Sequence, residues 1–350
     1  MKRWIIIALG LMITGTTAAQ DTTYITVEYH TEVQTNFGKK YNWVNLLSLM
    51  GELSSEKIHK RWKNGNFNID LISTYKIFDE RIAYDLMEFS NIEEENMIIN
   101  PFLLGYTHRW ERVSLFGGVR NVNLDYFATP YTSLFTNSSA GIFPTLSINL
   151  PLANYPLSAV CLHVEYQPTE KWLFKSSLYN GIAHDSRKNP LRSFIINPRE
   201  DGMISISELK YTQNKFGKGI YSLGIAVHAL GKQYKTTYSL WGTIEQAVFN
   251  NDQIEIGFLI QGGMAPPVKN ECSFYYAAGA YFAGLLTKQK KDKLGIYFNG
   301  ATFTNTKEQT MEITWQYQII DAIVIQPAFH CIRMGSETSF YGLFRVIFKV

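Results

Sequence analysis

The chain has 350 residues, with 33 basic and 30 acidic side chains and a net charge of +3 at pH 7. This balance provides no basic stripe for nucleic acid, and the three widely spaced cysteines, Cys161, Cys272 and Cys331, fit neither a disulfide framework nor a zinc motif. Charged residues make up 18% of the chain, below the ~25% of ordinary soluble domains, whereas aromatic residues reach 14%. Such a composition suits a surface in contact with lipid.

Residues 1–19 have the features of a secretory signal peptide. Lys2 and Arg3 precede an apolar stretch, and small residues lead to an expected cleavage site between Ala19 and Gln20. The apolar stretch is shorter than the ~20 residues that a membrane-spanning helix needs. We therefore expect an exported chain whose mature form carries 31 basic and 30 acidic side chains.

The segment 20–62 is expected to form an N-terminal periplasmic or plug segment. It includes one stretch, from about 41 to 62, with a helical pattern that Gly51, Ser54 and Ser55 interrupt. This is the helical element that the sequence favours before the strands begin.

Residues 63–350 contain short runs in which apolar and polar side chains alternate, separated by polar or turn-rich pieces. In the run 312–318, for example, Ile313, Trp315 and Tyr317 share one face and polar side chains share the other. Beyond the leader, no stretch approaches 18 uncharged apolar residues, so a transmembrane helix is not predicted. A chain of this pattern can satisfy its backbone in lipid only as a closed barrel.

The length of the chain fits that barrel. At ~20 residues per strand and connection, the 331 residues that remain after the leader supply roughly 16 strands. We therefore predict an all-β fold: a transmembrane antiparallel β-barrel of about 16 strands (16–18), with a short N-terminal helical segment. A barrel of this width leaves an aqueous channel.

The segment 119–181 resembles the central region of the carbohydrate-selective porin (OprB) family. It carries "LFTNSSAG" at 134–141 and "YQPTEKW" at 166–172, and other pieces follow in the family's order, such as "GGMAPPVKN" at 262–270 and "EITWQYQIIDAIVIQPAF" at 312–329. The resemblance implies an outer-membrane barrel of a Gram-negative bacterium that allows passive, sugar-selective diffusion of carbohydrates and small polar solutes into the periplasm. It implies carbohydrates and outer-membrane lipid as partners, and self-association of the barrel stays open.

Passage of sugars requires carboxylates, guanidinium groups and amides that replace water around hydroxyl groups, and it requires no nucleophile or metal. We expect this constriction around "RNVNLDYF" and "TNSS", with two carboxylates from later strands. The candidate solute-binding residues are Arg120, Asn121, Asn123, Asp125, Asn137, Ser138, Ser139, Glu245 and Glu255.

Strand parity qualifies this set. A strand through the segment places Asn121, Asn123 and Asp125 on the lumen side, and Arg120 then has the wrong parity, unless the strand has ended or a β-bulge re-aims it. The alternative for these side chains and for 137–139 is to brace a loop. For Glu245 and Glu255 the alternative is a solvated lumen wall without selectivity.

Enzymatic, metal-binding and cofactor-binding functions are not expected. His163 and Glu165 share a strand face with Cys161, but no second His or Cys lies near in sequence, so the pattern does not predict a soft-metal site. The sequence also lacks a G-x-S-x-G elbow, a phosphate-loop motif and H-E-x-x-H.

Two other functions fit parts of the pattern. One is a secreted soluble β-sandwich that binds or cleaves glycans, which would also show a signal peptide, alternation and many aromatics. The other is an outer-membrane barrel that does not conduct and serves as a scaffold.

Overall fold

The structure is a computed structural model that describes residues 23–38, 40–214, 217–232, 234–287 and 289–350. The expected signal peptide, 1–19, lies outside these described residues.

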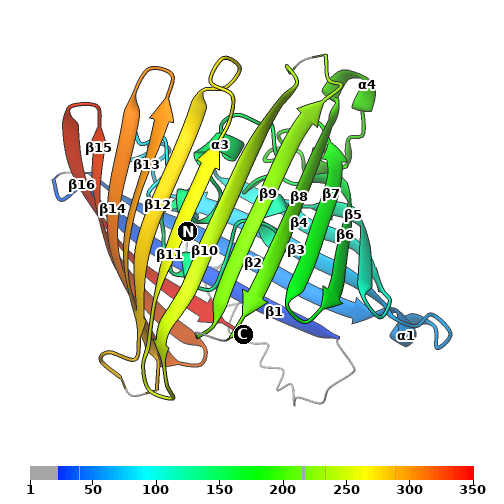
Figure 1. Cartoon of the computed structure of the whole chain (residues 1–350), viewed down its shortest axis with the longest axis horizontal. Coiled ribbons are helices and arrows are strands. Elements are labelled where there is room, and N and C mark those ends of the chain that lie inside the picture. The colour runs from blue at the N-terminus through cyan, green and yellow to red at the C-terminus, as the bar shows by residue number, and fades with distance from the viewer. Residues whose placement is uncertain (1–22, 39, 215–216, 233, 288) are drawn as a thin grey trace, which may run out of the picture.

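The described residues form sixteen antiparallel strands that close into one barrel (Figure 1). Each strand pairs with its neighbours in the chain, and the first strand pairs with the last, so that Glu28 lies opposite Lys349. The predicted all-β barrel of sixteen strands is therefore confirmed. The strands are β1 Tyr24–Thr35, β2 Tyr41–Ser54, β3 Gly65–Lys76, β4 Met97–Arg109, β5 Val113–Arg120, β6 Ala159–Thr169, β7 Trp172–Asn180, β8 Met203–Gln213, β9 Gly219–Ala229, β10 Thr237–Asn250, β11 Glu255–Met264, β12 Cys272–Ala283, β13 Asp292–Phe303, β14 Lys307–Ile320, β15 Ile323–Met334 and β16 Glu337–Lys349.

The helices are short. They are α1 Ser55–Ile58, η2 Val122–Leu124, η3 Thr132–Leu134, α2 Ser138–Gly141, α3 Pro144–Ser147, η4 Pro190–Phe194 and α4 Pro198–Asp201. Within the described ranges, none of them has the length and apolar character that crossing a membrane would require.

Because β1 begins and β16 ends at the same rim of the barrel, we call that rim the termini end and the opposite rim the loop end. Connections at the loop end are numbered in chain order. Three of them are long: L2 (77–96), L3 (121–158) and L4 (181–202).

The barrel is polar inside and apolar outside. On β14, Glu312 and Thr314 are fully buried in the lumen, whereas Ile313 is 38% exposed on the outer face. Trp315 and Tyr317 have the parity of Ile313, and their rings stack at 5.6 Å on that outer face. The alternation read from the sequence is thus that of a wall with lipid outside and polar contents inside.

The predicted N-terminal helix is wrong. β2 pairs along its length with both β1 and β3, and only Ser55–Ile58, one helical turn, follows it. The segment 20–62 is therefore not a separate plug, because its described residues build the first two strands of the wall. Leucines and methionine favour a helix locally, but the run also alternates, with Val44 buried in the lumen and Trp43 exposed outside. Sheet pairing on both sides outweighs the local helical preference.

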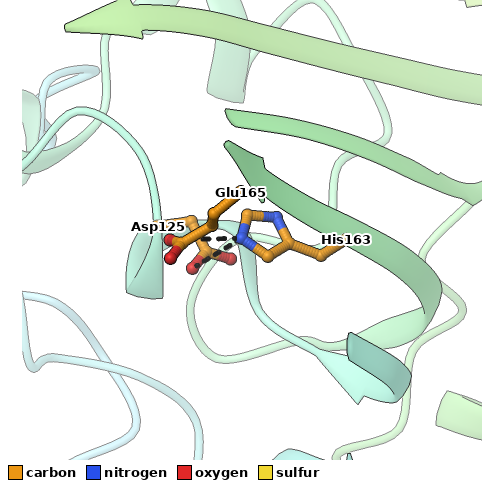
Figure 2. Close-up of side chains that lie close together, drawn as sticks. All are labelled: Asp125, His163 and Glu165. Carbon is orange, nitrogen blue, oxygen red and sulfur yellow. Dashed lines mark hydrogen bonds and ion pairs between the residues drawn. The ribbon is translucent and has the colours of Figure 1, made fainter. Parts of the chain in front are cut away.

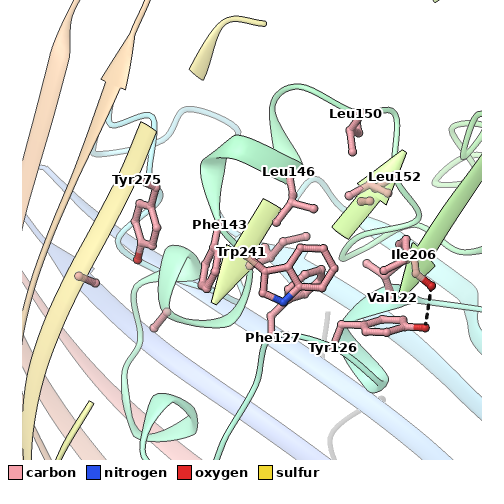
Figure 3. Packing of buried hydrophobic residues seen from close by; sticks show 14 of the residues in the cluster. Val122, Tyr126, Phe127, Phe143, Leu146, Leu150, Leu152, Ile206, Trp241 and Tyr275 are labelled. Carbon is pink, nitrogen blue, oxygen red and sulfur yellow. Dashed lines mark hydrogen bonds between the residues drawn. The ribbon is translucent and has the colours of Figure 1, made fainter. Parts of the chain in front are cut away.

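L3 folds into the barrel and packs an apolar side against the wall (Figure 3). The aromatic rings at 131, 135 and 143 each stack on a ring that the wall projects inward, and the ring at 127 meets such a ring edge-on, which explains why so many aromatics lie on the lumen side. The pairs, with their centroid distances, are Phe127–Trp241 (5.0 Å), Tyr131–Tyr281 (4.1 Å), Phe135–Tyr297 (4.6 Å) and Phe143–Tyr275 (5.1 Å).

Lumen-facing glycines provide the space for these rings. A Cβ on Gly295 would lie 2.6 Å from Cε1 of Phe135, and a Cβ on Gly257 would overlap the ring of Tyr131. The small residues that alternate with large ones on β11 and β13 therefore leave room for the aromatic rings of L3.

L2 also turns into the lumen. Its Ile82, Ala83 and Phe89 form a second buried apolar cluster with side chains of β15 and β16. The two loops are joined by backbone hydrogen bonds, from Asn91 N to Thr136 O (2.8 Å) and from Ser138 N to Glu88 O (2.8 Å). L2 and L3 together therefore narrow the lumen.

Candidate functional site

Two glutamates on β14 hold the two inward loops. Glu308 accepts hydrogen bonds from the backbone N–H groups of Leu86 (2.7 Å) and Met87 (3.1 Å) on L2. Four residues further along the same face, Glu312 accepts from the N–H groups of Thr136 (2.8 Å) and Asn137 (3.0 Å) on L3. Each carboxylate thus binds two consecutive amides, an arrangement that satisfies loop donors which water would otherwise have to solvate.

The first turn of L3 is held by an ion pair. Arg120, the last residue of β5, donates from Nε to Oδ2 of Asp125 (2.6 Å) and from Nη2 to Oδ1. Lys175 on β7 donates to the backbone oxygen of Asp125 (2.6 Å), and the Arg120 guanidinium lies over the ring of Phe116. β5 ends at Arg120, so the end of the strand, and not a β-bulge, is the explanation that holds for this residue. The Arg120 side chain lies on the lumen side.

Two side chains of β6 adjoin this ion pair (Figure 2). His163 Nε2 lies 3.6 Å from Asp125 Oδ1 and 3.4 Å from Glu165 Oε1. Lys175 lies 3.9 Å from Glu165, whose side chain is 36% exposed toward the lumen. The wall next to L3 therefore alternates cations and anions at close range.

Asn121 and Asn123 brace L3 rather than continue the strand. The Asn121 side chain accepts from Asn123 N (2.8 Å), which caps η2, and donates to Leu157 O. The Asn123 side chain accepts from Tyr155 N (3.1 Å) and also lines the cavity between L2 and L3.

The next three predicted residues lie where L3 meets L2. The Asn137 side chain accepts from Ser139 N and from Asn299 Nδ2 (2.9 Å). The Ser139 hydroxyl donates to Met87 O (3.1 Å) on L2. Ser138 is half-buried at the cavity wall. The structure therefore brings Asn123, Ser138 and Ser139 together, far from where a single strand would have put them.

Glu245 and Glu255 both bind the same residue of L3. Glu245 accepts from Tyr131 N (2.9 Å), and Glu255 accepts from the Tyr131 hydroxyl (2.7 Å). Glu255 also lies 3.8 Å from Lys290. In this structure both carboxylates position L3.

The cavity between L2 and L3 has a volume of about 340 Å³. Polar groups of both loops line it, among them Glu88, Asn91, Asn123, Ser138 and Asn154. Its size and lining suit one small polar molecule.

L2 contains a partly buried cluster of charges, in which Asp85 and Glu93 are buried and Glu88 is exposed. Arg81 lies between Asp85, Glu88 and Glu93 at distances of 3.4–3.9 Å. Burial raises the pKa of Asp85 and that of Glu93, although Arg81 opposes both shifts. The loop thus keeps its acids in the lumen next to one guanidinium.

L4 is tied to L2 at the loop end. Arg187 on L4 binds Asp185 through Nε (2.9 Å) and Nη2 (3.1 Å), and its Nη1 donates to Glu94 on L2 (3.1 Å). The hydrogen bonds from Arg187 lower the pKa of Asp185. The rim above L2 is therefore braced by charge.

The site residues predicted from the sequence do not include Glu308, Glu312, Lys175 or any residue of L2. Glu308 and Glu312 do lie on the polar face of an alternating run, which is a signal for the lumen, but their targets are about 175 to 220 positions away in the chain. Local pattern cannot supply such contacts.

The comparisons with known proteins agree with this architecture. Residues 12–338 match the model of the carbohydrate-selective porin, OprB family. The high-pH structure of Pseudomonas putida OprB superposes with a TM-score of 0.80 at 13% identity and covers 94% of both chains. None of the curated proteins compared with the chain matched it.

Other porins share the fold at lower similarity. The anion-selective porin from Comamonas acidovorans has a TM-score of 0.58 at 10% identity, covering 95% of this chain and 100% of its own. The trimer form of OmpT from Vibrio cholerae has a TM-score of 0.59 at 9% identity, covering 94% and 99%. The chain therefore belongs to the carbohydrate-selective porin (OprB) family, and it is an outer-membrane β-barrel porin for carbohydrates and not an enzyme.

Proposed function

We propose that neutral carbohydrates enter at the loop end, pass the cavity between L2 and L3, and leave along the ion-paired wall beside the first turn of L3. In this orientation the loop end faces the outside of the cell and the termini end faces the periplasm. The solute-contacting groups are Arg120, Asp125, Asn123 and Ser138. The remaining predicted residues act indirectly, by holding L3.

The observation that carries the proposal is that charges beside L3 occur in pairs. A single cation or anion in the constriction would attract one class of ion, whereas a paired array has little net field and still offers strong donors and acceptors. Sugar hydroxyls are both donors and acceptors, so they suit such an array. The pairs are Arg120 with Asp125, Lys175 with Glu165, and Lys210 with Glu208.

The architecture also supports a size limit. L2 and L3 fill part of a lumen that sixteen strands would otherwise leave open. Each loop is held by buried carboxylate contacts and by apolar packing, so the passage has a defined width. Binding in such a passage has to be weak enough for release.

Liposome swelling tests the proposal. Liposomes that contain the purified barrel are exposed to sugars of graded size and to matched salts. We expect rapid swelling with monosaccharides, slower swelling with larger sugars, and little difference between cation and anion permeability. Swelling that is absent for the smallest sugar would instead support a barrel that L2 and L3 close.

We also propose that copies of the barrel associate in the membrane. The support is the fold shared with the trimer form of Vibrio cholerae OmpT. Cross-linking in native membranes followed by electrophoresis tests this, and a product of single-chain size at every cross-linker concentration would argue against it.

A further inference from the structure

Three side chains that are separated in sequence converge next to the passage. Asp125 comes from L3, and His163 and Glu165 come from one face of β6 (Figure 2). One nitrogen or oxygen atom of each lies within 4.8 Å of the others. The sequence shows only the pair on β6, because the third group arrives with the fold of L3.

The histidine is held in a ligand-like orientation. Its Nδ1 lies 2.7 Å from Ser177 Oγ, which in turn lies 2.7 Å from the Tyr126 hydroxyl. His163 is 3% exposed. With Nδ1 bound to Ser177, the other ring nitrogen, Nε2, points into the gap between the two carboxylates. Metal-binding histidines commonly have such a partner on the nitrogen that does not bind the metal.

The distances from the histidine to the two carboxylates suit a small divalent ion. Zinc binds imidazole nitrogen and carboxylate oxygen at about 2.0–2.2 Å, so two ligands of one tetrahedral ion lie roughly 3.3–3.5 Å apart. Nε2 lies 3.4 Å from Glu165 Oε1 and 3.6 Å from Asp125 Oδ1, longer than the ~2.9 Å of a good hydrogen bond. We propose that Asp125, His163 and Glu165 bind a divalent transition-metal ion of the zinc class, with water as the remaining ligand, and that the bound ion slows solute passage.

Neighbouring cations set the strength of this site. Arg120 donates to both oxygens of Asp125, and Lys175 lies 3.9 Å from Glu165. A carboxylate oxygen has a second lone pair, so Asp125 keeps its bonds to Arg120 while Oδ1 binds the ion. Repulsion from the two cations weakens binding, and we expect an affinity in the micromolar range. Imidazole favours zinc or copper, whereas calcium and magnesium prefer sites made only of oxygen.

The position of the ion explains its effect on passage. Glu165 is partly exposed toward the lumen, which gives the ion a route into the site. Once bound, the ion joins the first turn of L3 to β6 and places a double positive charge beside the proposed solute path. This effect on passage rests on the proposed function, whereas binding of the ion does not.

Calorimetric titration of the folded barrel in detergent with Zn²⁺ tests the site directly. We expect one micromolar site per chain, with affinity at least tenfold lower in His163→Gln and in Glu165→Gln. His59→Gln, which changes an exposed histidine at a termini-end turn, is the matched control and keeps the site. Equal affinity in wild type and His163→Gln, or binding that only His59→Gln abolishes, would overturn the proposal. Heat-modifiable electrophoretic mobility confirms that each variant is folded.

Liposome swelling with a monosaccharide tests the consequence. Each variant is compared with its own rate without metal, and Mg²⁺ at equal concentration controls for charge screening. We expect Zn²⁺ to slow swelling at least twofold in wild type and in His59→Gln, but not in His163→Gln. Wild-type swelling that Zn²⁺ leaves unchanged, at a concentration that fills the site by calorimetry, would overturn the effect on passage. Swelling that is absent without metal would instead count against the proposed function.

Discussion

Glu312→Ala should release L3 from the wall without opening the barrel. The carboxylate accepts from Thr136 N, Thr136 Oγ1 and Asn137 N, and it is fully buried. The strand ladder that joins β14 to its neighbours uses backbone groups, which the substitution leaves in place. The effect should therefore be confined to the docking of L3.

The magnitude follows from the amides left without an acceptor. A buried donor that loses its partner costs about 1–3 kcal/mol, so two amides cost about 2–6 kcal/mol. The Thr136 hydroxyl keeps a partner, because it also lies 3.0 Å from His330 Nε2. A loss at the low end raises the undocked population of L3 about 30-fold. Glu312→Gln keeps one acceptor oxygen, so we expect about half of this loss.

Three measurements report the docking of L3. Liposome swelling should admit larger sugars, single-channel current should fluctuate more, and proteases should cut within 121–158. Glu52→Gln is the matched control, since Glu52 is a lumen carboxylate that accepts from Asn66 and Asn68 on β3 and has no bond to L3. It should leave all three measurements near those of the wild type.

If folded Glu312→Ala barrels show the wild-type sugar size limit and the same protease resistance in L3, the carboxylate does not hold the loop. The aromatic stacking between L3 and the wall would then be sufficient by itself.

Four further predictions concern a glycine that packs against an L3 ring, the ion pair at the start of L3, the outer face of the barrel and the contact between L4 and L2. Gly295→Ala should push away the L3 ring packed on it, with a loss of about 1–3 kcal/mol that thermal denaturation measures. Arg120→Gln should leave its carboxylate partner unpaired and make the channel prefer cations, seen as a shifted reversal potential in a salt gradient. Ile313→Lys should destabilise the barrel by about 2–4 kcal/mol, and a normal refolding yield in lipid would contradict the outward placement. Arg187 lowers the pKa of Asp185 from the ordinary aspartate value of 3.8. Their contact therefore stabilises the rim fully at pH values above 3.8, and this stabilisation is lost as the pH falls through the lowered pKa. Current noise should therefore rise at such acid pH in wild type, and Arg187→Gln should remove that pH dependence.

The sequence alone determined the barrel and its inside-out arrangement. Successive side chains of a strand point to opposite faces, so a local period of two is sufficient to place Ile313 on the outer face and Glu312 on the lumen face. Chain length then set the approximate strand number, because spanning strands have a narrow range of lengths. Neither inference needs a contact between distant residues.

Local preference failed where pairing with distant strands decided the outcome. The run 41–54 has leucines that favour a helix, but hydrogen bonds to β1 and β3 on both edges stabilise it as β2. Nothing within the run itself encodes those two partners. The sequence pattern therefore left its assignment open to error.

The constriction was decided by tertiary structure. The role of the L3 residues in binding solute stays a prediction, and their contacts reach across the chain, as when the backbone N–H of Asn137 binds Glu312. A loop that folds into a lumen is positioned by whichever donors, acceptors and rings the closed wall presents. That wall exists only after sixteen strands have closed, so neither the glutamate anchors nor the group formed by Asp125, His163 and Glu165 follows from local sequence.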